Sequence, residues 1–509
     1  MKAGLAFVGV IVTALLSLSS SGAQDKNLLI GVEYAFPGLG KTFAELRIPA
    51  VKLYPGLFAW GKMQKAPEAA IDFTMLDRLV RDYHDAGFQE IYISLSTINK
   101  WANKGPKNYT PKAEYGPHFD KWIQAIVERY DGDGTDDMPG LKRPLRYYEI
   151  SEEFSSYTPE PTADYLAMLE RAYKAAHAAF PGVTVLHAAF LTTTVFKDHP
   201  GPARYAAAFA AAPKRFMDKT LADIRALLSR PDIFDAVNFH SLGDPLEIED
   251  NVAWLRHEMA QRKYERPIFI SDTSPNFLIG WGPATRASGP PATLGILVPP
   301  ATEKDRPRLA QYFQKLVDGD KATIDWNHGF VADDMVKRVV VAAEQKVVLI
   351  NTAFMEDLVL LQAKFLQAGA GTSAWAGFVG SKINIFNERR TVTGKRAPFY
   401  AVGQLQGHLR DYADLRRLPH ADKHVRIYRW QQGQRTIWLA WLDPGKLLLP
   451  GDDPGAKMVH LKTGPGDFIV ERAIDRPGQT APDQATLTAE AGIVSLKLTA
   501  RPVYLFARK

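Results

Sequence analysis

Short apolar runs alternate with stretches of helical periodicity through the first three quarters of the chain. Eight runs predict buried strands that begin near residues 28, 50, 91, 145, 184, 235, 267 and 347. Apolar residues recur at helical spacing between them, in residues 71–88, 118–130, 162–180, 219–229, 248–263 and 331–346. Eight strand–helix units over about 380 residues predict a closed (β/α)8 barrel. No GxGxxG motif follows the first strand, as a Rossmann sheet would require.

Two stretches depart from this regular alternation. Residues 275–330 are rich in glycine and proline, with one expected helix near 305–318, and predict an insertion that forms a lid or rim. Beyond a last barrel helix at 396–410, the pattern changes to short alternating strands joined by turns. We therefore expect an α/β fold, with a TIM barrel over residues 24–414 and an all-β sandwich domain over 415–509.

The N-terminus has the pattern of a secretory signal peptide. One basic residue precedes an apolar run from Ala3 to Leu18, and small residues lead to Ala23. We expect residues 1–23 to be removed and the protein to be secreted or periplasmic. No other apolar stretch is long enough to span a bilayer, so no membrane association is expected after cleavage.

Composition narrows the function classes. At 46% hydrophobic and 23% charged residues, the 509-residue chain has the composition of a globular protein. Its net charge of +6 is dispersed without a basic stripe, so nucleic-acid binding is not expected. The absence of cysteine excludes disulfides and thiolate metal sites, and no His/Asp/Glu spacing fits catalytic zinc, so we expect neither metal nor other cofactor. Nothing in the sequence indicates an oligomeric state.

Two predicted strands end in carboxylates. The run LRYYEISEEF ends in Glu152 and Glu153, and RPIFISDTS places Asp272 at the end of the seventh strand. In a parallel barrel, functional groups lie at the carboxyl ends of the strands. Glycoside hydrolysis needs one protonated and one ionised carboxyl group. We interpret Glu153 as the catalytic acid and Asp272 as its partner.

These segments resemble the clan of retaining glycosidases built on a (β/α)8 barrel, nearest the β-xylosidase and α-L-iduronidase families, which carry a barrel followed by a β-sandwich. YEISEEF is similar to the family's YEIWNEP, which matches Glu153 to the acid/base. RPIFISDTS is similar to KPIWITETG, which places Asp272 where the nucleophile stands. FAWGKMQ and FDAVNFHSL also resemble family segments. The resemblance implies an exported hydrolase of a polysaccharide or oligosaccharide that retains anomeric configuration.

The chain departs from that family at three positions. Glu152 replaces the asparagine that contacts the sugar, Ser151 replaces tryptophan, and Asp272 replaces glutamate. Because Asp is shorter than Glu by about 1.5 Å, inversion with Asp272 as a base stays open. Two other readings stay open as well: a barrel that only binds carbohydrate, or another carbohydrate-modifying enzyme on the same scaffold. Sugar, linkage and exo or endo action are not determined.

Several further residues are candidates for binding the carbohydrate. Glu152 would contact sugar or tune a neighbouring pKa, or form only a structural ion pair. His240 would hydrogen-bond sugar or the seventh-strand carboxylate, or simply pack. Tyr34 and Lys52 end the first two strands and would line the cleft or serve its rim. Aromatic side chains in the insertion suit stacking on sugar rings, although such residues also anchor long loops: Phe277, Trp281 and Trp326.

Overall fold

The computed structural model describes residues 27–155, 160–196, 199–212, 219–275, 297–357 and 374–508. The expected signal peptide at 1–23 and the candidates Phe277 and Trp281 lie outside these residues. Within the described ranges, no helix has the length and apolar character needed to cross a membrane.

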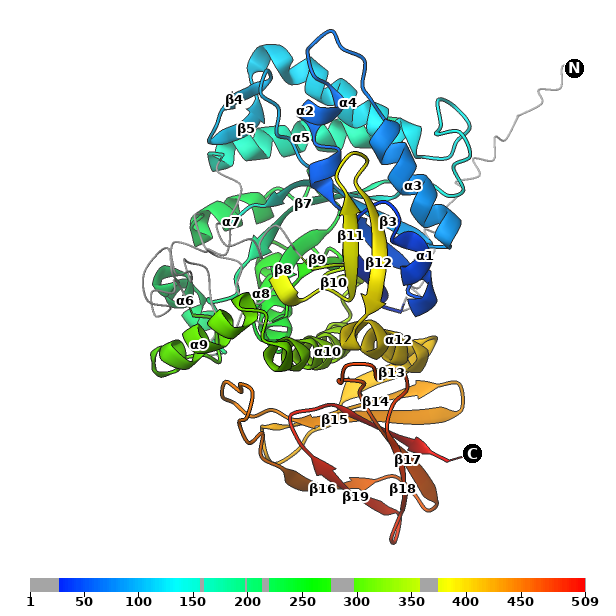
Figure 1. Ribbon diagram of the computed structural model, residues 1–509. Helices are drawn as coiled ribbons and strands as arrows, with labels where there is room; N and C mark the ends of the chain where they lie inside the picture. Colours follow the sequence, from blue (N-terminus) through cyan, green and yellow to red (C-terminus); the bar gives the residue numbers. More distant parts are fainter. Residues whose placement is uncertain are drawn as a thin grey trace, which may run out of the picture.

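Within these ranges, eight parallel strands close into a barrel (Figure 1). Their order around the barrel is β1-β10-β9-β8-β7-β6-β3-β2. All eight predicted strands are present, and the predicted fold class is confirmed. The strands are β1 (Leu29–Ala35), β2 (Ala50–Leu53), β3 (Glu90–Leu95), β6 (Tyr147–Glu153), β7 (Thr184–Leu191), β8 (Val237–Ser241), β9 (Ile268–Thr273) and β10 (Leu349–Thr352).

Amphipathic helices cover the outside of the barrel (Figure 1). Helix α3 illustrates why they form: Leu76, Leu79 and Tyr83 lie buried on one face, and Gly87 ends the helix at a φ of +99°. The covering helices are α3 (Thr74–Ala86), α4 (Gly116–Arg129), α5 (Thr162–Ala179), α7 (Leu221–Leu228), α8 (Glu247–Gln261), α10 (Lys321–Glu344) and α12 (Ala397–Leu409). Shorter elements lie at the rim: α1 (Gly40–Phe43), α2 (Trp60–Met63), β4 (Asn103–Gly105), β5 (Asn108–Pro111), α6 (Tyr205–Ala211) and α9 (Arg306–Val317).

Helix α10 begins ten residues before the start at 331 that the sequence pattern predicts. The carboxylate of Asp320 caps it by accepting a hydrogen bond from the Thr323 amide at 2.9 Å. The first turns of α10 pack on α9 and bury a polar stretch of α10 that contains Asn327 and His328. Because these buried positions are polar, the apolar periodicity of a helix is not visible in this part of the sequence. The predicted insertion therefore ends in helix, and Trp326 lies on α10 instead of a loop.

A β-hairpin that the sequence pattern did not predict follows β10. It consists of β11 (Val379–Asn384) and β12 (Arg389–Lys395), drawn in yellow in Figure 1. The Arg390 guanidinium lies 3.5 Å from the centre of the Phe36 ring and pairs with Glu356 at 2.9 Å. These contacts hold the hairpin against the ends of β1 and β10. Its side chains are mostly polar and partly exposed, which explains why no apolar alternation marks it in the sequence.

The C-terminal region is an antiparallel β-sandwich (Figure 1, orange to red). One sheet of the described residues has the order β13-β14-β15-β20-β17-β18, and β16 and β19 form a second ribbon. Apolar side chains from both pack together, including Trp438, Phe468 and Leu496. The strands are β13 (Tyr412–Arg417), β14 (Val425–Gln432), β15 (Arg435–Leu442), β16 (Lys457–Lys462), β17 (Asp467–Arg472), β18 (Gln484–Thr488), β19 (Ile493–Leu498) and β20 (Val503–Ala507).

Candidate active site

Glu153 is the last residue of β6 and is joined to the neighbouring strands by His240. Its Oε1 lies 2.6 Å from His240 Nδ1, and His240 Nε2 lies 3.0 Å from the Ser271 hydroxyl on β9. Burial disfavours a charge on the imidazole, but the hydrogen bond and charge of Glu153 outweigh burial and raise the pKa of His240. His240 therefore holds a proton that it donates to Glu153. The sequence predicted that this histidine would bond to sugar or to the seventh-strand carboxylate, whereas in the structure its carboxylate partner is the fourth-strand acid Glu153.

A bulge in β6 determines where the two adjacent acids point. Ser151 has a φ of +71°, and the pairing of β6 with β7 shifts register between Ile150 and Glu153. The strict alternation of side chains is thereby broken. Glu153 is buried, whereas Glu152 is exposed to solvent.

Glu152 lies in the electrostatic field of the same group of residues as Glu153. Although solvent reaches its side chain, the surrounding walls desolvate the carboxylate and raise its pKa. Lys52 opposes this effect, while the charges of Glu153 and Glu149 add to it. Glu152 is thus accessible to solvent and partly desolvated, as an acid in a cleft would be. Such an acid is suited to contact a sugar hydroxyl.

Beneath these acids, the fully buried Glu149 ties several strands together. It accepts hydrogen bonds from Ser94 on β3 at 2.5 Å and from Asn238 on β8 at 2.8 Å. The Ser271 hydroxyl lies 3.3 Å away and the Lys52 ammonium 3.7 Å away. A buried carboxylate needs such partners, and this network fixes the strand ends that carry the exposed groups. The sequence carried a signal for it, because Glu149 interrupts an apolar strand.

Lys52 and Tyr34 lie at the centre of the candidate active site. Their positions near the ends of the first two strands bring them there. The Lys52 ammonium lies 3.9 Å from Glu33 in addition to its contact with Glu149. Burial alone would lower the pKa of Lys52, but Glu149, then Asp272 and Glu33, outweigh burial and raise it. Tyr34 donates from its hydroxyl to Asp272 Oδ2 at 3.5 Å. Both residues therefore contact carboxylates of the site.

Asp272 lies near the end of β9, with His240 opposite it in register on β8. It is half-buried: Oδ2 is directed to Tyr34, whereas Oδ1 is enclosed. The neighbouring acid Glu33, on β1, is fully buried and was missed by the sequence analysis. A signal was present, because Glu33 is an acid within the apolar run LLIGVEYAF.

Trp326 does not join the carboxylates. Its ring stacks on Phe330 at 5.6 Å and meets the edge of Tyr312 at 5.7 Å, which joins α10 to α9. A sugar-stacking role for it stays a prediction. The rings of Phe354 and Tyr54 accompany Tyr34 at the site: Phe354 stacks on it at 5.0 Å, and Tyr54 meets it edge-on at 5.3 Å.

A cavity of about 980 Å³ lies at the rim of the barrel, past the carboxyl ends of β7 and β8. Its lining includes Thr193, Thr194 and Glu247 of the barrel and Asp443 of the sandwich domain. Neither Glu153 nor Asp272 lines the cavity, so it is not the site of the carboxylate chemistry. The strands beneath it, β7 and β8, are those that separate β6 from β9 in the barrel.

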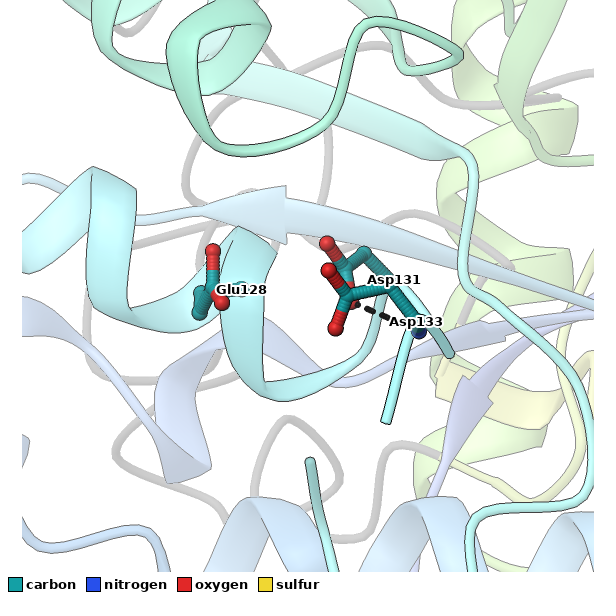
Figure 2. Close-up of side chains that lie close together, drawn as sticks. All are labelled: Glu128, Asp131 and Asp133. Atoms are coloured by element: carbon teal, nitrogen blue, oxygen red, sulfur yellow. Dashed lines mark hydrogen bonds between the residues drawn. The ribbon is translucent and has the colours of Figure 1, made fainter. Parts of the chain in front are cut away.

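One group of acids in the described residues has metal-binding spacing. Glu128, Asp131 and Asp133 bring one carboxylate oxygen each within 4.8 Å of one another (Figure 2). Asp131 Oδ1 accepts a hydrogen bond from the Asp133 amide at 3.2 Å, a local turn that accounts for the approach of these two. The group spans the last turn of α4 and the loop that leads to β6, and so lies at the opposite end of the barrel from Glu153.

Comparisons with known proteins place this geometry among solved structures. No protein-family model and no curated protein matches the chain by sequence. The structure is similar to a family 39 glycoside hydrolase from the gut symbiont Bacteroides cellulosilyticus WH2, with 13% identity, a TM-score of 0.57 and coverage of 95% of this chain and 81% of that one. It is also similar to a monomeric β-xylosidase from Caulobacter crescentus CB15, with 14% identity, a TM-score of 0.51 and coverage of 94% and 95%.

A family 39 enzyme from Xanthomonas axonopodis pv. citri is similar over 95% of this chain and 94% of its own, at 12% identity and a TM-score of 0.53. Each of these similarities extends over almost the whole of this chain. The chain therefore shares its fold, the (β/α)8 barrel with its β-sandwich, with glycoside hydrolases of the type that the sequence resembles.

Proposed function

We propose that this protein is an exported glycoside hydrolase that cleaves glycosidic bonds of a polysaccharide or oligosaccharide with two carboxylates. One observation carries the proposal: Glu153 and Asp272 end the fourth and seventh strands of one barrel, and His240 lies between them. The contact of His240 with Glu153 and its register with Asp272 connect the two acids. The fold shared with glycoside hydrolases supports it.

Glu153 is the acid in this proposal. Its Oε1 accepts from His240, and its Oε2 is enclosed and accepts no hydrogen bond from the described residues. In the proposed mechanism the substrate approaches Oε2, whose proton passes to the glycosidic oxygen as the C1–O bond breaks. Asp272 Oδ2 forms a bond to C1 from the opposite face. Water then replaces Asp272 at C1, with Glu153 accepting its proton. The proton that Glu153 gives to the leaving oxygen in the first step is replaced by one from water in the second, so the full cycle restores the protonated Glu153.

The stereochemistry of the first product tests the role of Asp272. If Asp272 is the nucleophile, NMR shows retained configuration, and Asp272→Glu keeps or raises activity because the longer side chain reaches C1 more easily. If Asp272 activates water, the wild type inverts, and Asp272→Glu fills the place of the water and lowers the rate. We favour the nucleophile, and inversion by the wild type would contradict that choice.

The rim cavity supports an oligomeric substrate. His199, Asp244 and Asp250 place polar side chains next to apolar walls, as sugar rings require. A chain whose cleaved bond lies between Glu153 and Asp272 would extend over β7 and β8 into this space. Comparing kcat/KM on a disaccharide with that on longer oligosaccharides measures this contribution.

A barrel that only binds carbohydrate is the second candidate. It is favoured by the short side chain of Asp272 and by the near-complete burial of Glu153, which is 5% exposed. Purified protein should be screened against a polysaccharide panel with detection of new reducing ends. Release of reducing ends supports the hydrolase, whereas binding without release supports the second candidate.

Export is a separate part of the proposal, supported by the N-terminal sequence. N-terminal sequencing of the protein recovered outside the cytoplasm should begin at Gln24. Recovery of the uncleaved chain from the cytoplasm would contradict it.

A further inference from the structure

Glu33 is a third carboxylate at the site, and the proposed mechanism does not use it. It lies on β1 with 0% exposure, so it has no access to substrate. Its Oε1 accepts a hydrogen bond at 3.1 Å from the amide of Thr273, the residue that follows Asp272. The chain therefore places a buried acid directly against the strand end that carries Asp272.

Each of these two acids has one enclosed oxygen atom. Glu33 Oε2 and Asp272 Oδ1 are both inaccessible to solvent, and neither accepts a hydrogen bond from the described residues. The Lys52 ammonium lies 3.9 Å from Glu33 Oε2, beyond hydrogen-bond distance. The Asp272 side chain adjoins that of Glu33, and after burial its charge and proximity raise the pKa of Glu33. Two carboxylates form a hydrogen bond only when one of them is protonated, because otherwise two acceptors and two negative charges would face each other.

We propose that Glu33 and Asp272 share one proton, held on Glu33, and that Glu33 is a positioning residue which fixes Asp272 with Oδ2 towards the substrate. The inference rests on the proposed function and deepens it. Donation from Glu33 Oε2 to Asp272 Oδ1 leaves the negative charge on Asp272, the acid with an oxygen at the cleft. Tyr34 contacts that second oxygen, so both oxygens of the short side chain are oriented.

The charges around Glu33 support this assignment of the proton. From β2, Lys52 approaches Glu33 at 3.9 Å but is nearer to Glu149 of β6, at 3.7 Å. From β9, Asp272 adds negative charge, and Tyr34 lies beside Glu33 on β1. Adjacent β10 contributes Asn351, a neutral amide. One ammonium thus faces four carboxylates, those of Glu149, Asp272, Glu33 and Glu152. Burial, followed by the charge of Asp272, raises the pKa of Glu33.

Infrared difference spectroscopy tests the shared proton without any turnover. At pH 7, the spectrum of the wild type minus that of Glu33→Gln should contain the carbonyl stretch of one protonated carboxyl group, because the bands of other protonated acids, such as Glu153 and Glu247, cancel in the difference. In Asp272→Asn this band should shift in frequency, since its hydrogen-bond partner is changed. No carbonyl band in the difference between wild type and Glu33→Gln would overturn the proposal.

Kinetics test the positioning role. Glu33→Gln can still donate, from its amide, and should keep kcat within about threefold, whereas Glu33→Met cannot and should lose about 100-fold in kcat with little change in KM. Above the pKa of Glu33, the wild type should lose activity as the ionised pair repels. In Glu33→Gln this alkaline loss should disappear, since no proton can be lost.

A matched control is Glu356→Gln, a buried acid at the end of β10 whose partner is Arg390. It should leave the alkaline loss unchanged, and circular dichroism should confirm that each variant is folded. Equal kcat in Glu33→Met and wild type would overturn the positioning role. If the wild type cleaves no substrate, the proposed function fails, and the infrared band alone decides whether the proton is shared.

Discussion

The acids of the site differ in how completely the barrel encloses them, and this difference separates their roles. Glu33 and Glu149 are fully buried, Glu153 is 5% exposed, and Glu152 is exposed. A buried acid needs fixed partners, whereas an acid at the cleft can exchange protons with a substrate. The enclosed pair therefore supports the strand ends, and the proposed chemistry falls to Glu153 and Asp272.

At the scale of single residues, Glu153→Gln removes the proton donor. It keeps the side-chain volume and an oxygen that can accept from His240. Hydrolysis of substrates with poor leaving groups should fall by about 100-fold or more, because the departing oxygen needs a proton. Activated aryl glycosides, whose leaving groups depart as anions, should be nearly unaffected in the bond-breaking step. Values of kcat/KM, which report the bond-breaking step, measure the difference between the two substrate classes, and equal losses in kcat/KM would argue against Glu153 as the acid.

At the scale of single elements, strained strand ends adjoin the site. Tyr34 on β1 has a φ of +60° and Ser151 on β6 a φ of +71°, and a register shift lies next to each. Positive φ is costly for residues other than glycine and persists where surrounding packing enforces it. In β6, this conformation separates the directions of Glu152 and Glu153.

Ser151→Val should therefore lower the free energy of unfolding by about 1–3 kcal/mol, because a β-branched residue disfavours positive φ. Urea unfolding measures this change. Thr184→Val on adjacent β7, where φ is not positive, is the comparison and should be close to neutral. Activity should fall together with stability in Ser151→Val, since Glu152 and Glu153 would be redirected. A variant as stable as the wild type would show that the bulge is not strained.

At the scale of the whole molecule, a buried polar contact joins the barrel to the sandwich. Glu471 on β17 accepts from Gln404 on α12 at 2.6 Å and lies 2.8 Å from His408 Nε2 on the same helix. The Trp430 indole on β14 donates to the His408 carbonyl at 2.8 Å. These contacts hold the barrel and the sandwich, which form from separate parts of the chain, in one relative orientation.

Glu471→Ala should lower the free energy of unfolding by about 3 kcal/mol, because it leaves the buried partners of Glu471 without a hydrogen-bond acceptor. Burial opposes the Glu471 charge, but hydrogen bonds from His408 and Gln404 outweigh burial and lower the pKa of Glu471 below its ordinary value of 4.5. This stabilisation is therefore present above about pH 4.5 and is lost as the pH falls through the lower pKa of the folded protein.

The free energy of unfolding of Glu471→Ala should accordingly depend less on pH below 4.5 than that of the wild type. Urea unfolding at several acidic pH values measures both slopes. Glu490→Ala, at an exposed position of the same domain, should match the wild-type slope. Parallel slopes for Glu471→Ala and the wild type would contradict the assignment.

The sequence by itself determined the barrel, the sandwich and the strand ends that carry Glu153 and Asp272. Apolar runs and helical periodicity are local signals, and in a parallel barrel the carboxyl ends of all strands meet on one face. The position of an acid at the end of a run is therefore enough to place it. The same reasoning brought Tyr34, Lys52 and His240 to the site.

Only the tertiary structure decided which side chains meet there. The contact of Glu33 with Asp272 joins residues on β1 and β9, and it depends on how far the strands are staggered when the barrel closes. The bulge at Ser151 and the early start of α10, which moves Trp326 onto a helix, depend on packing against distant segments. Non-local contacts of this kind leave no periodic pattern in the sequence, so the proton-sharing pair became visible only once the chain was folded.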